Sequence, residues 1–156
     1  MLEVIVFVGL QGAGKSTFHA QRFAASHVLV SKDNFPNNSR PERRQRHLIT
    51  EALAAAHSVV VDNTNPSRAD RAGIIAVARS FQARLIGYFF LSPMAECLVR
   101  NAARTRRVPD VGLFATARKL ERPSTTEGFD ELFAVRTLAG LQFAVTPYLE
   151  TSDEPR

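Results

Sequence analysis

The residues with the clearest chemical potential lie near the start of the chain, in a glycine-rich segment after a short apolar run. Residues 9–16 read GLQGAGKS. Glycines let the backbone curl so that successive N–H groups point inward at phosphate oxygens, and a helix starting at Lys15 adds its positive end. Lys15 can then reach the β- and γ-phosphates of ATP, while the Ser16 hydroxyl takes a place on Mg²⁺. The predicted ATP-binding residues here are Gly9, Gln11, Gly12, Ala13, Gly14, Lys15, Ser16 and Thr17.

Acidic residues follow two later apolar runs. Asp33 comes directly after the run at 27–31, and Asp62 follows three valines. A carboxylate at the first position can take the proton from an attacking hydroxyl, although a turn or cap aspartate has the same pattern. A carboxylate at the second position can hold Mg²⁺ or one of its waters from a neighbouring strand. Asp33 is therefore a candidate catalytic base and Asp62 a candidate metal ligand.

Polar side chains beside these carboxylates are candidate substrate contacts. Lys32 precedes Asp33, and Asn63, Thr64 and Asn65 follow Asp62. The alternative interpretation of Asn65 is a cap for the helix predicted to start at Pro66. We expect Lys32, Asp33, Asp62, Asn63 and Asn65 to face the substrate.

A basic segment lies between residues 100 and 110. Arg100 and Arg104 are one helical turn apart, and Arg106 and Arg107 follow before Pro109 breaks the helix. A segment of this kind can close over bound ATP, neutralise charge on the moving phosphoryl group and exclude water. The alternative is a solvated basic helix face.

A second basic stripe lies on the helix predicted over Ser39–Ala56. Arg40, Arg43, Arg44 and His47 share one face of it. Ser39 followed three residues later by Glu42 predicts a capping box at its start. The stripe either borders an acceptor cleft and binds phosphates there, or is a solvated face, and the pattern leaves both open.

Apolar runs alternate with helical patterns along the chain. The predicted strands are Leu2–Val8, His27–Ser31, Ser58–Asp62, Arg84–Leu91 and Phe133–Leu138. The predicted helices are Lys15–Ala25, Ser39–Ala56, Pro66–Ser80, Met94–Arg104 and Asp110–Leu120. This alternation predicts an α/β fold of the P-loop NTPase or kinase type: a three-layer sandwich with a central parallel sheet of about five strands and an arginine-bearing lid. Ligands of such sheets bind at the carboxyl ends of the strands.

Length and composition restrict the class of protein. The 156 residues predict one domain over 1–156. Cys97 is the single cysteine, so no internal disulfide can form and a reducing, cytoplasmic location is expected. The apolar run at the N-terminus is too short for a membrane segment. The net charge of +5 favours anionic partners. The polar tail ETSDEPR suggests no function.

With these motifs in place, the chain resembles the kinase domain of 5′-hydroxyl polynucleotide kinases, above all that of the bifunctional polynucleotide kinase–phosphatases. The matching segments are GLQGAGKSTF, SKDNF, VVVDNTNPSRADR, LVRNAARTRRVPD and RKLERPSTTEGFDEL, in family order. The third and fifth segments are the most specific. Similar segments also occur in small bacterial P-loop ATPases, so the resemblance extends to a broader clade.

The resemblance implies a role for several residues. Lys15 and Ser16 match the phosphate-binding lysine and the Mg²⁺-binding hydroxyl, and Asp33 matches the aspartate that deprotonates the 5′-hydroxyl. Asp62 matches the essential aspartate after the third strand, and Arg104 matches the lid arginine that contacts ATP phosphates. Lys32 stands where the family has arginine, and Pro36 stands where the phage enzyme has an arginine that holds acceptor phosphate.

The sequence thus predicts an ATP-dependent kinase with Lys15, Asp33 and Arg104 as catalytic residues. The favoured acceptor is the 5′-hydroxyl of a DNA or RNA end. The first alternative is a small-molecule kinase acting on a sugar, nucleoside, nucleotide-sugar or antibiotic hydroxyl, which the absence of an aromatic platform favours. The second is a non-catalytic ATP-binding module.

Overall fold

A computed structural model describes residues 1–150 of the chain, and the predicted tail lies outside them from residue 151 on. Within this part, six strands form one sheet in the order β2-β3-β1-β4-β5-β6. Their bounds are β1 (Glu3–Val8), β2 (Val28–Val30), β3 (Val59–Val61), β4 (Arg84–Phe90), β5 (Glu131–Leu138) and β6 (Gln142–Pro147). The first five strands are parallel, which confirms the predicted α/β fold with its central parallel sheet.

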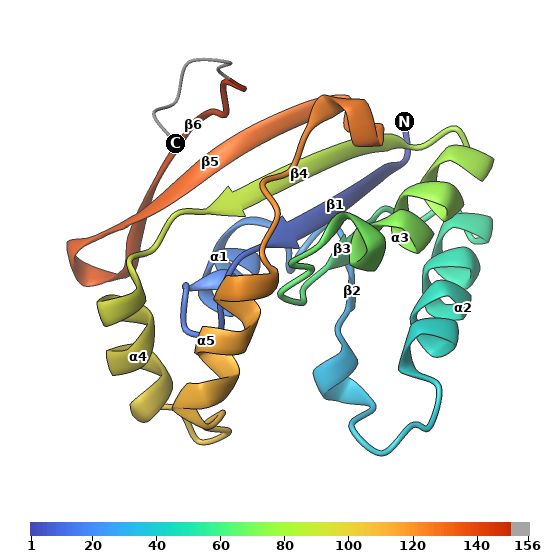
Figure 1. Cartoon of the computed structure of the whole chain (residues 1–156). Helices are drawn as coiled ribbons and strands as arrows, with labels where there is room; N and C mark the ends of the chain where they lie inside the picture. Colours follow the sequence, from blue (N-terminus) through green and yellow to red (C-terminus); the bar gives the residue numbers. More distant parts are fainter. Residues whose placement is uncertain (151–156) are drawn as a thin grey trace.

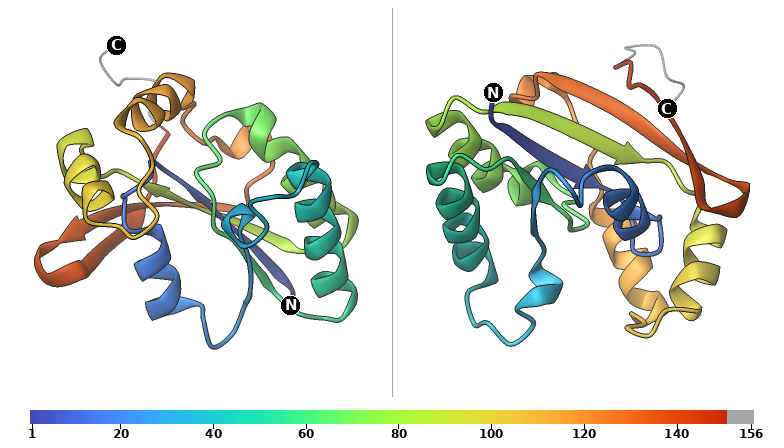
Figure 2. Two further views of the ribbon diagram at one scale, coloured as in Figure 1. Left: turned by 90° about the horizontal axis from the view of Figure 1, so that it is seen from below. Right: turned by 180° about the vertical axis from the view of Figure 1, so that it is seen from behind.

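The sixth strand is a feature that the sequence analysis missed. β6 runs antiparallel to β5 after a tight turn at Ala139–Leu141, where Gly140 has a φ of 71°. The hairpin forms one edge of the sheet and extends beyond the helices (Figure 2). Its Phe143 ring packs against Phe18 at 5.2 Å between ring centroids, so the hairpin is fixed to the start of the first helix. The hairpin therefore borders the glycine-rich loop.

Helices cover both faces of the sheet (Figure 1). Their bounds are α1 (Lys15–Arg22), α2 (Pro41–Ala54), α3 (Arg68–Ser80), α4 (Met94–Ala102) and α5 (Asp110–Lys119). Ile49 of α2 and Ile74 of α3 join one buried core with Val6 of β1. Phe18, Cys97 and Leu113, from α1, α4 and α5, join the second core. Because alternate side chains of a strand point to opposite faces, β1 is buried on both, as its apolar run predicts.

Two helix starts differ from the sequence prediction. α2 begins at Pro41 after Arg40, with no side-chain cap, so the predicted capping box at Ser39 is wrong. Glu42 instead forms an ion pair with Lys32. α3 begins at Arg68, and Ser67 and Asp70 form its capping box. The interpretation of Asn65 as a helix cap is therefore also wrong.

An ion pair with little solvent exposure joins two of the segments that carry the family resemblance. Arg71 of α3 is 0% exposed, and its Nε donates to Glu127 at 2.8 Å. Glu127 lies in the short turn Thr125–Glu127, where its carboxylate also accepts the Ser124 N–H. The pair fixes the start of α3 to the segment before β5. No helix of residues 1–150 has the length and apolarity that crossing a membrane requires.

Candidate active site

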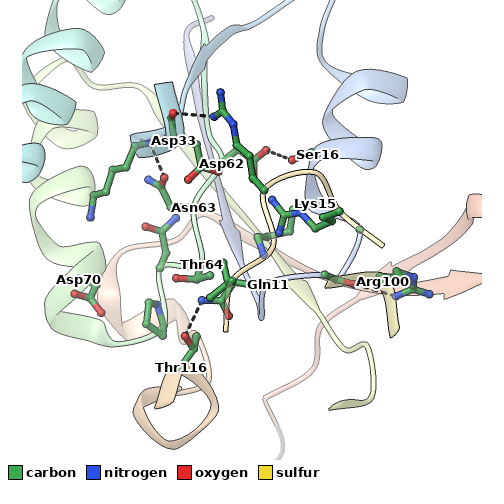
Figure 3. A pocket seen from close by; sticks show the side chains of 18 of the residues that line it. Gln11, Lys15, Ser16, Asp33, Asp62, Asn63, Thr64, Asp70, Arg100 and Thr116 are labelled. Carbon is green, nitrogen blue, oxygen red and sulfur yellow. Dashed lines mark hydrogen bonds between the residues drawn. The ribbon is translucent and has the colours of Figure 1, made fainter. Parts of the chain in front are cut away.

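A pocket of about 770 Å³ lies beyond the carboxyl ends of β1, β2 and β3, where ligands of parallel sheets bind. Asp33, Asn63, Thr64 and Asp70 form one wall, and Lys15, Ser16 and Arg100 lie on the opposite side (Figure 3). The pocket thus brings together most of the residues selected from the sequence. Among those, Gly9 and Ala13 belong to the loop but do not line the pocket.

The glycine-rich loop has the backbone that its sequence predicts. Gly12 and Gly14 have φ values of 76° and 95°, in the left-handed region that glycine adopts without strain. A Cβ atom on Gly12 would lie 2.4 Å from the carbonyl oxygen of Cys97, so glycine is also required by packing against α4. The loop therefore packs closely against α4, with backbone that can curve around phosphate oxygens.

Lys15 is the cation inside this loop. Its side chain is buried, and its Nζ donates to the carbonyls of Gly9 at 3.0 Å and Leu10 at 2.5 Å. Burial lowers the pKa of Lys15 to about 8, against the opposing influence of the Asp62 carboxylate. An anionic phosphate in the loop would give this ammonium group a charged partner, which its own loop does not supply.

Ser16 and Asp62 form a pair suited to a divalent cation. The Ser16 Oγ donates to the Asp62 carboxylate at 3.2 Å, next to the loop. Burial raises the pKa of Asp62, and Lys15 and Ser16 oppose that shift. Residues 1–150 contain no group of three or more His, Cys, Asp or Glu side chains placed to hold a metal ion. The donors present fit Mg²⁺, which takes one or two protein oxygens and fills its remaining positions with phosphate and water.

Asp33 sits on a single turn of 3₁₀-helix, Lys32–Asn34, that follows β2. Its exposed side chain lines the pocket, and its backbone N–H donates to Ser31 Oγ at 3.3 Å. The turn is held by Asn63, whose Oδ1 accepts the Lys32 N–H at 2.9 Å. The Asn63 amide in turn donates to the buried Gln45 of α2 at 2.5 Å. Asn63 therefore positions the Asp33 turn and also lines the pocket, where it stays a predicted substrate contact.

The segment predicted to form a lid covers the end of α4 and the connection to α5, and its arginines reach different parts of the pocket. Arg100 donates to the Gly12 carbonyl at 3.3 Å and to Thr137 of β5 at 3.0 Å. Arg104 lines the pocket from the segment after α4, and its charge acts on Lys15. Arg106 donates to the Asp33 carbonyl at 3.1 Å, so the lid contacts the turn that carries the candidate base.

Several residues of the site were missed by sequence reasoning. Asn101 is fully buried. Its side-chain amide donates to the Val108 carbonyl and accepts the Val108 N–H, so these two bonds tie the two ends of the lid segment together. Thr116 of α5 accepts a hydrogen bond from Gln11 at 3.0 Å. Lys119, one turn later, pairs with Asp70 at 3.0 Å. Their spacing of three along α5 is the signal that could have placed both side chains on one face.

The structure also places Asn65 and the basic stripe of α2. Asn65 lines the pocket, is buried, has a φ of 43°, and donates from its side chain to the Phe7 carbonyl at 2.8 Å, so its amide group links the β3 turn to β1. The basic stripe of α2 lies outside the pocket lining, to which α2 contributes Glu42 alone. Arg43, Arg44 and His47 are exposed, which is the solvated alternative for that face.

Comparison with known proteins identifies the family to which the sequence belongs. Residues 4–123 match the family described as AAA domain (AAA_33). The L-seryl-tRNA(Sec) kinase of Methanococcus maripaludis is 24% identical over 142 residues, covering 81% of this chain and 56% of that protein. The bifunctional polynucleotide phosphatase/kinase of Schizosaccharomyces pombe is 26% identical over 133 residues, covering 81% of this chain and 32% of that protein. The chain therefore spans about half and a third of the lengths of these relatives.

The fold is also that of solved kinase structures. A gluconokinase from Sinorhizobium meliloti superposes with a TM-score of 0.62 at 23% identity, over 86% of this chain and 82% of that chain. The sequence relatives bear the names of a seryl-tRNA kinase and a polynucleotide phosphatase/kinase, and this structural neighbour bears that of a gluconokinase. Together these findings show the family of the chain and a P-loop kinase fold.

Proposed function

We propose that this chain, which belongs to the AAA domain family AAA_33, is an ATP-dependent phosphotransferase that moves the γ-phosphate to a hydroxyl group. One observation carries the proposal: the loop lysine, the Ser16–Asp62 pair, the exposed Asp33 carboxylate and the lid arginines all line one pocket. A site that only bound nucleotide would have no use for Asp33 opposite the loop.

The donor end holds and neutralises the triphosphate. The loop backbone and Lys15 bind the β- and γ-phosphates, in place of the carbonyls that Lys15 contacts here. Ser16 and Asp62 would hold Mg²⁺, which neutralises phosphate charge when bound. Arg104, helped by Arg100 and Arg106, stabilises charge on the moving phosphoryl group from the lid side.

The acceptor end supplies the base. Asp33 accepts the proton of the acceptor hydroxyl, whose oxygen forms a bond to the γ-phosphorus. The bond between that phosphorus and the oxygen bridging to the β-phosphate breaks, and ADP leaves with the bridging oxygen. Because Arg106 donates a hydrogen bond to the Asp33 carbonyl, closure of the lid would also position the turn that carries the base. Positioning and charge therefore provide most of the catalysis.

Two acceptor classes fit this chemistry. The segments shared with polynucleotide kinases, and the name of the Schizosaccharomyces pombe relative, favour the 5′-hydroxyl of a DNA or RNA end. The lining of the pocket favours a small hydroxylated molecule, because none of its residues is aromatic. The two classes share every step described above and differ only in what surrounds the reacting hydroxyl.

The test is transfer of label from γ-labelled ATP and Mg²⁺ to a mixture of acceptors. The mixture contains DNA and RNA strands with a 5′-hydroxyl, the same strands with a 5′-phosphate, nucleosides and monosaccharides. We expect labelled product with the wild type and with Glu51→Gln, a matched charge removal on α2 outside the pocket. We expect at most about a hundredth of that product with Lys15→Ala or Asp33→Asn. ATP binding without transfer to any acceptor would overturn the proposal and leave a nucleotide-binding module.

A further inference from the structure

We infer that the acceptor is a small uncharged molecule with several hydroxyl groups, and that Glu42 and Asp70 discriminate against phosphorylated acceptors. This inference rests on the proposed function and concerns the wall of the pocket that faces the loop. The γ-phosphoryl group moves from ATP to a hydroxyl oxygen on this wall, the proton goes to Asp33, and ADP is released. What surrounds Asp33 therefore selects the acceptor.

The lysines of this wall are neutralised by carboxylates. Lys32 forms an ion pair with Glu42, and Lys119 forms one with Asp70 at 3.0 Å. All four residues line the pocket. A site for a polyanion needs cations whose charge is available to phosphate, as in nucleic-acid-binding proteins. Here each lysine has a carboxylate beside it. A phosphate that bound the lysine would lie close to this carboxylate and be repelled by its charge.

The two ends of the pocket differ in charge balance. At the donor end, Lys15, Arg100 and Arg104 are balanced by Asp62 in the lining and by Glu96, which pairs with Arg100 at 3.4 Å from outside it, so one positive charge is left over. At the acceptor end, Lys32, Lys119 and Arg106 are matched by Asp33, Glu42 and Asp70. The field is therefore positive where the triphosphate binds and close to neutral where the acceptor binds. A second polyanion gains little from the acceptor wall.

The remaining groups of this wall suit hydroxyls. Thr64 lies on this wall in Figure 3, and Thr116 of α5 lines the pocket where it accepts a hydrogen bond from Gln11 of the loop. Carboxylates accept hydrogen bonds from hydroxyl groups, and hydroxyl and amide side chains both donate and accept. A few such groups placed around a concave site are what orient a small polar ligand.

Features that would hold a polynucleotide lie elsewhere or are missing from the lining. Single-stranded nucleic acid is commonly held by bases stacked on aromatic rings, and no lining residue is aromatic. The arginines of the α2 stripe, Arg40, Arg43 and Arg44, do not line the pocket. An acceptor that reaches Asp33 therefore meets paired charges and hydroxyls.

The experiment compares acceptors that differ only in charge. We would measure kcat/KM with nucleosides and their 3′-phosphates, monosaccharides and their phosphates, and a 5′-hydroxyl oligonucleotide. We expect the uncharged member of a pair to exceed its phosphorylated partner and the oligonucleotide at least tenfold. Equal or better transfer to a phosphorylated acceptor or the oligonucleotide would overturn the inference and leave the proposed function intact. Bound ATP with no transfer to any acceptor would overturn the proposed function itself.

A second measurement tests Glu42 directly. Glu42→Gln frees the charge of Lys32, so kcat/KM for phosphorylated relative to uncharged acceptors should rise several-fold. Glu51→Gln removes the same charge from the same helix outside the pocket and should leave that ratio at its wild-type value. An unchanged ratio in Glu42→Gln would overturn the assignment of Glu42. Asp70 is unsuitable for this test because it also caps α3.

Discussion

Two buried cations, Lys15 and Arg71, lie at the starts of helices that follow neighbouring strands of the same sheet. They differ in how many hydrogen-bond partners surround them and in whether one of these partners is an anion. Arg71 is 0% exposed and Lys15 is 8% exposed. The guanidinium of Arg71 uses all five of its donors, on Glu127 and on the carbonyls of Asn65, Pro66 and Glu121. The ammonium of Lys15 has two carbonyls of its own loop and no hydrogen-bonded anion.

The difference separates a structural charge from a functional one. Arg71 has no donor left for a ligand, and its partners close around it. Lys15 carries a charge that its surroundings stabilise poorly, because burial lowers its pKa to about 8. A phosphate group would supply the missing anion. The two regions therefore predict opposite responses to mutation: loss of stability at Arg71 and loss of activity at Lys15.

Arg71→Ala should lower the stability of the fold and has the largest expected effect. Removing one partner of a buried ion pair leaves the Glu127 carboxylate buried and uncompensated, at a cost of about 3–5 kcal/mol in the free energy of unfolding. Urea denaturation measures this cost. Arg68→Ala, an exposed arginine on the same helix, serves as control and should change the free energy by less than about 0.5 kcal/mol. Equal effects of the two variants would contradict the structural role of Arg71.

Lys15→Ala should have its effect on phosphate transfer. Loss of one preorganised donor at a transferring phosphoryl group lowers turnover by roughly 10²–10³-fold. The free energy of unfolding should stay within about 1 kcal/mol of the wild type, since removing a poorly stabilised charge offsets the lost partner of Asp62. Label transfer and urea denaturation of the same preparation test both parts. A loss of stability like that of Arg71→Ala would remove the distinction between the two cations.

Local patterns explain why the loop could be predicted from the sequence and the ion pair could not. Residues 9–16 specify strand, turn and helix within one short segment, and Asp33 and Asp62 follow apolar runs that read as strands. Arg71 and Glu127 are 56 positions apart, and nothing in either neighbourhood indicates the other. The segments most specific to the family resemblance are those joined by this pair, so much of that resemblance reflects packing.

The errors have similar physical causes. β6 was missed because it lies at the sheet edge, contains Pro147 and has no fully buried side chain, so its apolar pattern is weak. The Ser39 capping box failed because the N-cap of the helix lies one residue later, at Arg40, and Glu42 pairs with Lys32, a contact that sequence spacing does not show. Asn65 was assigned to substrate or helix, and its amide instead reaches β1. In each case a tertiary contact decided the outcome.

Asn63→Ala extends the comparison to the acceptor end of the pocket. Asn63 makes only structural hydrogen bonds, but these bonds position the turn that carries Asp33. Loss of its bonds to Lys32 and Gln45 should loosen the Asp33 turn and lower kcat roughly tenfold. ATP affinity, measured by titration calorimetry, should stay at the wild-type value because the loop is untouched. Weaker ATP binding with kcat unchanged would contradict the positioning role. Asn101→Ala, which releases the lid segment instead, provides the contrasting variant.

The smallest expected effect is the pH dependence of ATP binding. Bound phosphate favours protonated Lys15, so ATP affinity should fall as pH rises through its free-state pKa of about 8. Between pH 7 and 8.5 the fall should be about fourfold. Lys15→Arg keeps its charge over this range and should show a flat profile, although its geometry differs. An equally steep profile in Lys15→Arg would assign the titration to another group.

The most direct test of the proposed phosphotransfer is single-turnover transfer by Asp33→Asn, with ATP binding measured on the same sample. This substitution keeps the shape of the side chain and removes its capacity to accept a proton. We predict ATP affinity within about twofold of the wild type and transfer to the acceptor hydroxyl slower by roughly 10²–10⁴-fold. Transfer at the wild-type rate would contradict the assignment of Asp33 as the base and the acceptor site built around it.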